Sequence, residues 1–172
     1  MFTAVRRIQF CAGHRVMEHG SKCRNMHGHN YVAFIHAHAL VLDRLGMVID
    51  FGVLKDVVGK WIDDNWDHGF IYHEQDKVVY SALLQFQSEE VHAKPGFGQK
   101  LFALPYNPTA ENMAQYLLEK STELLQPYNV GVSKVVLYET ENCFAEVVPG
   151  IRWQIPPYDP NTVYRAEGPI HT

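Results

Sequence analysis

Residues 27–42 (HGHNYVAFIHAHALVL) constrain the fold of this chain more than any other stretch, because they are long and rich in β-branched and aromatic side chains. Such a run predicts a β-strand, in which alternate side chains point to the same face of a sheet. His27 and His29 then share one face, whereas the second pair, His36 and His38, points to the other. The strand therefore opens with two imidazoles that can converge on one metal ion.

The surroundings of this H-x-H motif favour zinc, since imidazole nitrogen suits that ion and Gly28 lets the two backbones come close. A catalytic zinc site usually keeps three protein ligands and one open position. Cys23 lies just upstream. Taken alone, the spacing leaves open whether Cys23 is a third ligand or a nearby base or nucleophile. Two surface histidines beside a buried thiol are the simpler interpretation of this motif by itself.

The rest of the chain predicts an α+β domain with the element order β-β-α-α-β-β. A strand at residues 3–12 comes before the histidine-rich strand, and strands at 132–140 and 143–148 close the order. Asp50 is expected to cap the first helix, whose apolar stripe repeats with helical spacing at Leu54, Val57, Val58, Trp61 and Ile62. The second helix is expected to start with Asn107 as its cap and Pro108 in its first turn. This order favours an antiparallel sheet with both helices on one face.

The length of 172 residues predicts a single domain over residues 1–172. Residues 73–105 lack a clear pattern and are interpreted as an insertion, with a flexible turn at 94–98. Residues 149–172 are rich in proline and are interpreted as a C-terminal extension.

Composition excludes several classes of partner. The formal net charge is −4 and the chain has no run of Lys and Arg, so nucleic acid is not expected to be a partner. No stretch approaches the roughly 20 apolar residues of a membrane span, so no membrane contact is expected. The N-terminal residues lack the long apolar core of a signal peptide. Three cysteines without framework spacing predict reduced thiols and a cytoplasmic protein.

Two further sets of polar residues need a partner or a role. Asp67 and His68 follow the first helix, where a carboxylate can orient an imidazole. Glu139 shares a strand face with the apolar residues Val135 and Leu137. Because an unpaired buried carboxylate is unfavourable, Glu139 must reach solvent or meet a partner.

Five motifs occur in a specific order: His14, the C-x-x-x-H-G-H segment from Cys23, Asp67-His68, the sequence PTAEN at 108–112, and YET at 138–140. This combination resembles the 6-pyruvoyl-tetrahydropterin synthase and 6-carboxy-tetrahydropterin synthase family over residues 3–148. The short gap between Cys23 and His27 is similar to the carboxy-tetrahydropterin branch of the queuosine pathway. The region between the third and fourth motifs, from His68 to Pro108, is longer than that family implies, and the tail beyond Val148 is extra.

The resemblance implies a tunnelling fold (T-fold), whose subunits form trimers with a closed barrel and stack into hexamers. It implies active sites at subunit interfaces and a zinc ion on three histidines, His14, His27 and His29. The implied reaction converts 7,8-dihydroneopterin triphosphate into 6-carboxytetrahydropterin, acetaldehyde and triphosphate.

The resemblance also implies roles for the other motif residues. Cys23 is the general base, and Asp67 and His68 complete a proton relay. Glu139 holds the pterin, with help from Thr109 and Ala110 at the start of the second helix. A triphosphate also needs cations, for which the basic residues Arg15, Lys22 and Arg24 are candidates by their charge alone, and surface solubility explains these residues equally well.

Three alternatives remain at this point. Cys23 can be the fourth ligand of a closed, structural zinc site. The enzyme can be a pyruvoyl-type synthase or a folate-pathway paralogue. In a third alternative, from a different class, the chain is a non-catalytic module that binds zinc or a pterin.

Overall fold

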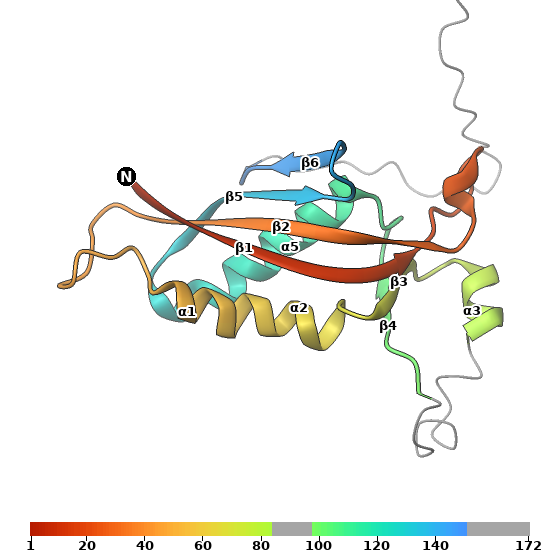
Figure 1. The fold of residues 1–172 in the computed structure, drawn as a ribbon, viewed down its shortest axis with the longest axis horizontal. Coiled ribbons are helices and arrows are strands. Elements are labelled where there is room, and N and C mark those ends of the chain that lie inside the picture. Colours follow the sequence, from red (N-terminus) through yellow and green to blue (C-terminus); the bar gives the residue numbers. More distant parts are fainter. Residues whose placement is uncertain (84–97, 151–172) are drawn as a thin grey trace, which may run out of the picture.

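The computed structural model describes residues 1–83 and 98–150, which form one sheet with helices on one of its faces (Figure 1). The strand order in the sheet is β4-β3-β1-β2-β5-β6. The strands are β1 (Phe2–His14), β2 (His27–Ala39), β3 (Gly69–His73), β4 (Leu101–Leu104), β5 (Gly131–Tyr138) and β6 (Phe144–Val147). The α+β class predicted from the sequence is therefore confirmed.

The sheet differs from the prediction in being mixed. The strands β1, β2, β5 and β6 pair antiparallel, but β3 pairs parallel with β1, and β4 pairs parallel with β3. The reason is the helical segment before β3, which carries the chain back along the sheet so that β3 runs in the direction of β1. Both β3 and β4 come partly or wholly from the region interpreted as an insertion, as does α3 (Lys77–Leu83). Most of the expected turn at 94–98 and nearly all of the C-terminal extension lie outside the described residues.

The alternation predicted for β2 is confirmed by burial. The side chains of Tyr31, Ala33, Ile35 and Ala37 are all fully buried against the helices, whereas the residues between them are partly exposed. The antiparallel register places Phe10 opposite Tyr31 and His14 opposite His27. One face of the β1–β2 pair therefore carries both the core and the histidines.

The first helical segment forms as its apolar stripe predicts. Asp50 is the N-cap of α1 (Phe51–Leu54), and its side chain accepts a hydrogen bond from Gly52 N at 2.6 Å. The helix continues through a π-helical turn, η2 (Lys55–Gly59), into α2 (Lys60–Asn65). Three stripe residues, Leu54, Val58 and Ile62, are buried in the core.

The second long helix, α5 (Ala110–Leu125), begins later than predicted. Thr109 is its N-cap and accepts from Asn112 N, whereas the sequence pattern favoured Asn107. Asn107 instead uses its side chain to hold the main chain of Met17, accepting from its N–H at 2.8 Å and donating to its carbonyl at 3.0 Å. A tertiary contact therefore displaces the expected cap.

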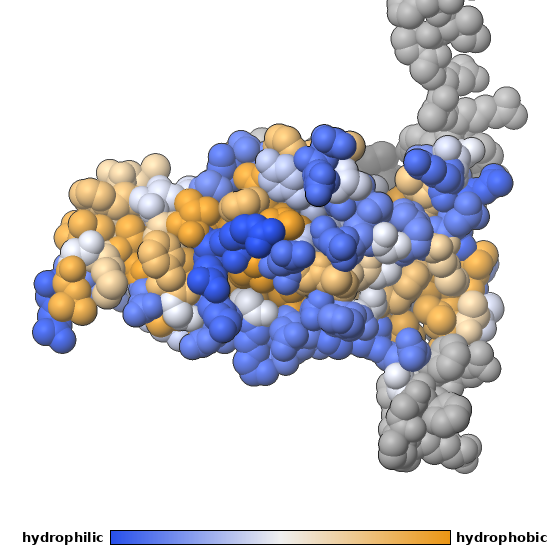
Figure 2. All heavy atoms as spheres, viewed as in Figure 1, coloured by the Kyte–Doolittle hydropathy of each residue, from blue (hydrophilic) through white to orange (hydrophobic). Residues whose placement is uncertain are grey.

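The two ends of the β1–β2 pair differ in character. His14 and His27 lie at one end, and the loop after β2 lies at the other (Figure 1). That loop exposes the apolar side chains of Leu40, Val41 and Leu45, and Figure 2 shows hydrophobic surface at this end. Within the described ranges, no helix has both the length and the apolar character needed to span a membrane.

Candidate metal centre and proton-transfer residues

Three histidines meet where β1 ends and β2 begins. His14, His27 and His29 each offer a ligand nitrogen, and these atoms all lie within 4.8 Å of one another. Their ring centroids are 4.5 to 5.1 Å apart. The pairing of His14 with His27 across the two strands, together with the alternation along β2, brings the three rings to one face. The group predicted as a metal site is therefore assembled within one chain.

Backbone carbonyls set the orientation of two of these rings. Nδ1 of His14 lies 2.7 Å from the carbonyl oxygen of Pro108, and Nδ1 of His27 lies 2.8 Å from that of Asn25. A carbonyl can only accept, so each ring donates from Nδ1 and keeps a lone pair on Nε2. Such outer hydrogen bonds are typical of metal-binding histidines. The Nε2 atom of His14 is buried without a hydrogen-bond partner, as a ligand atom requires.

The electrostatic environment favours the neutral form of His14 and His29. The pKa of His14 is lowered to about 4, mainly by burial. The hydrogen bond to Pro108 opposes this shift, and the nearby His27 and His29 contribute to it. Burial also lowers the pKa of His29, although Glu139 opposes this shift. Neutral imidazole is the form that binds a metal, so these shifts favour a cation in the cluster.

Cys23 lies close in sequence but outside the ligand group. It sits half-buried in the short helix η1 (Lys22–Arg24) between β1 and β2, where its carbonyl accepts from Val16 N at 2.8 Å. Among the residues that the structure describes, the group of potential ligands consists of the three histidines, without Cys23. This arrangement favours an open three-histidine site over a closed site with a cysteine ligand.

Glu139 follows directly after β5 and faces the histidine cluster. Its Oε1 atom lies 3.3 Å from Nε2 of His14 and 3.6 Å from Nε2 of His29, and its side chain is 26% exposed. The polar groups nearest to this carboxylate are thus the two imidazoles. Because a lone pair on Nε2 would repel the carboxylate, a cation between them is favourable. The donor set therefore fits a divalent metal ion.

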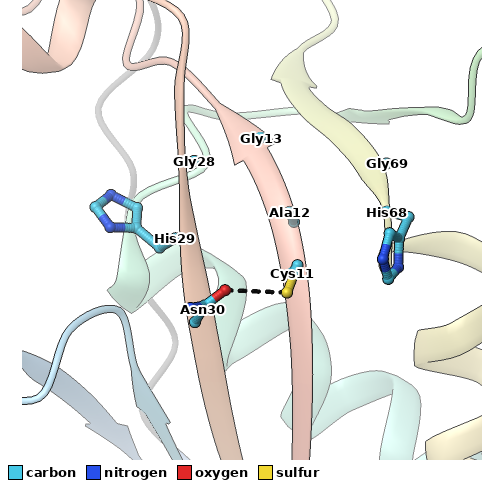
Figure 3. A pocket seen from close by; sticks show the side chains of 8 residues that line it. All are labelled: Cys11, Ala12, Gly13, Gly28, His29, Asn30, His68 and Gly69. Carbon is cyan, nitrogen blue, oxygen red and sulfur yellow. Dashed lines mark hydrogen bonds between the residues drawn. The ribbon is translucent and has the colours of Figure 1, made fainter.

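Asp67 and His68 form a pair just before β3, at the edge of β1 that faces away from β2 (Figure 3). His68 Nδ1 lies 2.7 Å from Asp67 Oδ2, and the other carboxylate oxygen accepts from Cys11 N at 2.7 Å. The His68 side chain is 80% exposed, whereas that of Asp67 is 21% exposed. The structure thus contains the predicted carboxylate–imidazole pair, with its imidazole directed to solvent.

The pKa of Asp67 is lowered by its neighbours. Partial burial acts to raise it, but the Cys11 N–H, the hydrogen bond and charge of His68, and the charge of Lys100 together outweigh that effect. Asp67 is therefore an anion at neutral pH, which fixes the proton of His68 on Nδ1 and leaves Nε2 available to accept one.

The pair is separated from the metal centre of its own chain. Figure 3 shows an open pocket in which His29 and His68 lie on opposite sides of β1 and β2, with Cys11 and Asn30 between them. Cys11 Sγ donates to Asn30 Oδ1 at 3.0 Å. Within the described residues, no hydrogen bond or ion pair joins the side chain of Cys23 to Asp67 or His68.

The residues predicted near the pterin have other contacts in the free chain. The hydroxyl of Thr109 caps α5, and Ala110 is the first residue of that helix. The structure adds Pro108, whose carbonyl orients His14. No local sequence pattern could predict this contact, because the two residues lie 94 positions apart.

The three basic residues considered as triphosphate contacts differ in their surroundings. Arg15 forms an ion pair with buried Asp76 at 3.1 Å, whereas Lys22 and Arg24 are exposed.

Gly28 allows the close approach of the strands that carry the histidines. A Cβ atom at this position would lie 2.9 Å from the carbonyl oxygen of Ala12, which is main chain and cannot turn aside. Gly28→Ala is therefore expected to lower the free energy of unfolding by about 1–3 kcal/mol, as overpacking does. The measurement is the thermal midpoint of the metal-free protein.

Gly59→Ala is the matched control for this prediction. A Cβ at Gly59 would lie 3.7 Å from Lys55 Cγ, an ordinary contact, and the position is helical. Alanine there is expected to leave the midpoint unchanged or raise it. Equal midpoints for Gly28→Ala and the parent protein would contradict the steric argument.

The sheet with helices on one face and the three-histidine cluster at the end of its central strands define a T-fold protein with a candidate metal centre. The sequence matches the 6-pyruvoyl tetrahydropterin synthase family over residues 3–149. The chain belongs to the 6-pyruvoyl tetrahydropterin synthase family.

Several individual relatives carry the name of the carboxy-tetrahydropterin branch of this family. A protein of Rickettsia conorii named 6-carboxy-5,6,7,8-tetrahydropterin synthase is 45% identical over 148 residues, covering 86% of this chain and 100% of that protein. A protein of the same name from Haemophilus influenzae is 30% identical over 152 residues, covering 85% and 98%.

Solved structures share the fold. An uncharacterized protein of Wolinella succinogenes aligns with a TM-score of 0.73 and 26% identity, covering 86% of this chain and 98% of that one. The 6-pyruvoyl tetrahydropterin synthase of Caenorhabditis elegans aligns with a TM-score of 0.57 and 23% identity, covering 86% and 94%, which supports the fold alone. The predicted T-fold is confirmed.

Proposed function

We propose that this protein is a zinc-dependent lyase that converts 7,8-dihydroneopterin triphosphate into 6-carboxy-5,6,7,8-tetrahydropterin, acetaldehyde and triphosphate, a step of queuosine biosynthesis. The observation that carries this proposal is the three-histidine cluster, in which outer carbonyls orient two rings. The shared name of the relatives at 43–45% identity supports the choice of reaction. All three cysteines are free thiols, which supports a reducing, cytoplasmic setting.

His14, His27 and His29 would hold the zinc ion. Bound zinc would supply Lewis-acid polarisation of the hydroxyl oxygens on the side chain of the substrate. Cys23 lies four residues before His27, in the short helix that leads to the metal ligands, and would accept a proton from the substrate. A thiolate near cations can serve as such a base.

His68 would receive and return the proton, with Asp67 fixing the tautomer through the 2.7 Å bond to Nδ1. This pair lies across two strands from the histidine cluster of its own chain (Figure 3), and His68 is exposed. The Asp67–His68 pair of one subunit would therefore serve the histidine cluster of a neighbouring subunit. This supports a homo-oligomer, a trimer or hexamer, with active sites between subunits.

The decisive experiment incubates the zinc-loaded protein with 7,8-dihydroneopterin triphosphate and identifies the products by mass. Release of acetaldehyde with 6-carboxytetrahydropterin is the expected result. A 6-pyruvoyl product or cleavage to a folate precursor would assign a different reaction to the same site. Tight binding of the pterin without any product would instead indicate that the protein is a non-catalytic pterin-binding module.

Glu139→Gln is expected to weaken pterin binding. One carboxylate can accept both the ring N–H and the adjacent amine of a pterin, and glutamine replaces one acceptor with a donor. Loss of this charge-assisted contact corresponds to roughly 2–4 kcal/mol, or about 30- to 1,000-fold in affinity. The measurement is the dissociation constant of a pterin ligand, together with the thermal midpoint.

Glu141→Gln is the control, because Glu141 is exposed in the same turn and loses the same charge. Its pterin affinity is expected to equal that of the parent. Unchanged affinity in Glu139→Gln would remove this residue from the pterin pocket. A fall in the midpoint with intact affinity would make it a structural partner of His14 and His29.

A further inference from the structure

The turn that presents His68 is held on one side by β1. The carboxylate of Asp67 accepts from the N–H of Cys11 at 2.7 Å, and the N–H of His68 donates to the Cys11 carbonyl at 2.7 Å. Cys11 in turn lies beside Asn30 of β2 in the pocket shown in Figure 3. These main-chain bonds fix one edge of the turn.

A lysine from a distant part of the chain holds the opposite side. Lys100 Nζ donates to the carbonyl of Asp63 at 2.5 Å and to that of Asp67 at 2.6 Å. The carbonyl of Lys100 accepts from Phe70 N at 2.9 Å, just after the turn. Lys100 therefore contacts the chain both before and after His68.

The aliphatic part of this lysine also packs against the turn. A Cβ atom at Gly69 would lie 3.1 Å from Lys100 Cδ and 3.1 Å from the carbonyl oxygen of Trp66. Gly69 thus leaves room for the lysine side chain where it crosses the turn. Lys100 is only partly exposed, and its ammonium group is held by the two carbonyls of Asp63 and Asp67.

The turn needs such support because of its backbone conformation. His68 has a φ of 54°, in the left-handed region that non-glycine residues rarely adopt. Residues held in that region persist when surrounding contacts over-determine them. The carbonyls of Asp63 and Asp67 also lie at the negative end of α2, where a cation is favourable.

We propose that Lys100 is a positioning residue for proton transfer, which holds the Asp67–His68 turn so that the imidazole keeps its place and its contact with Asp67. This inference rests on the proposed function only in giving the pair a proton-transfer role. In the described part of the chain, no hydrogen bond or ion pair joins Lys100 to the histidine cluster, so its effect passes through the turn.

The test compares Lys100→Met, which removes both hydrogen bonds but keeps much of the aliphatic stem, with Lys100→Arg, which can donate to both carbonyls. Lys60→Met is the control, since Lys60 lies on α2, the helix whose Asp63 carbonyl Lys100 contacts, is exposed and pairs with Asp64 at 2.8 Å. Zinc content and the thermal midpoint are recorded for every variant.

The first readout is turnover of 7,8-dihydroneopterin triphosphate. Lys100→Met is expected to lower kcat by about tenfold or more, as misplacement of a reacting group does, while KM and zinc content stay unchanged. Lys100→Arg is expected to recover most of kcat, and Lys60→Met to match the parent. An unchanged kcat in Lys100→Met, or an equal loss in Lys60→Met, would overturn the proposal.

The second readout is amide hydrogen exchange in the fully assembled protein, which does not depend on the reaction. Exchange at the N–H groups of His68 and Phe70 is expected to accelerate in Lys100→Met and not in Lys100→Arg. Unchanged exchange at both sites would overturn the proposal even if kcat fell. If the parent protein does not turn over the pterin, the proposed function fails, and the exchange rates still decide the role of Lys100.

Discussion

His27→Ala is expected to reduce bound zinc from about one ion per chain to a small fraction, because an open site has only three protein ligands. The His27 ring contacts both other rings of the cluster, with centroids 4.5 Å from His14 and 5.0 Å from His29. We expect the two remaining imidazoles to lose zinc during dialysis with a chelator. The measurement is zinc per chain by elemental analysis after that dialysis.

His36→Ala is the matched control, since His36 belongs to the other H-x-H pair and points to the opposite face of β2. It is expected to keep the zinc content of the parent. Near-infrared or visible bands of a cobalt-substituted protein give a second readout, which should vanish only in His27→Ala. Full zinc occupancy in His27→Ala would refute the assignment of the three-histidine site.

Cys23→Ala is expected to keep the fold and the zinc but to lose turnover by about 10²–10⁴-fold, the usual contribution of a positioned acid or base. The physical reason is that the ligand group is complete without the sulfur atom, so the thiol is free for proton transfer. The measurement pairs zinc content with the rate of product formation from 7,8-dihydroneopterin triphosphate.

Cys143→Ala serves as the control, because Cys143 is an exposed free thiol. Its rate and zinc content are expected to match those of the parent. Loss of zinc together with activity in Cys23→Ala would instead make Cys23 a metal ligand and the site a closed one. The two readouts therefore separate the base from the ligand.

Local patterns were sufficient where the chemistry is local. The alternation along β2 correctly separated His27 and His29 from His36 and His38, because side chains in an extended chain alternate whatever lies around them. The stripe from Leu54 to Ile62 likewise predicted a helix and its buried face. Asp67 and His68 are neighbours in sequence, so their pairing needed only a short turn.

The predicted start of the second helix was wrong, because a distant segment of the chain binds the side chain that was expected to cap it. Asn107 has the features of a helix cap, but it bonds the main chain of Met17, and α5 starts only after Thr109. Here a partner far away in the sequence offers a better contact than the local role.

The sequence by itself determined the α+β class and the strand that carries His27 and His29, because periodicity and residue chemistry are properties of the chain. His14 joined the candidate ligands through the family resemblance, and the structure places its ring beside the other two. Only the tertiary structure decided that β3 and β4 run parallel to β1, that Pro108 orients His14 and that Lys100 bonds to the carbonyl of Asp67 beside His68. These contacts join residues 33 to 94 positions apart or depend on strand direction. Such contacts form only when the collapsed chain brings distant carbonyls and donors together, and no local pattern encodes them.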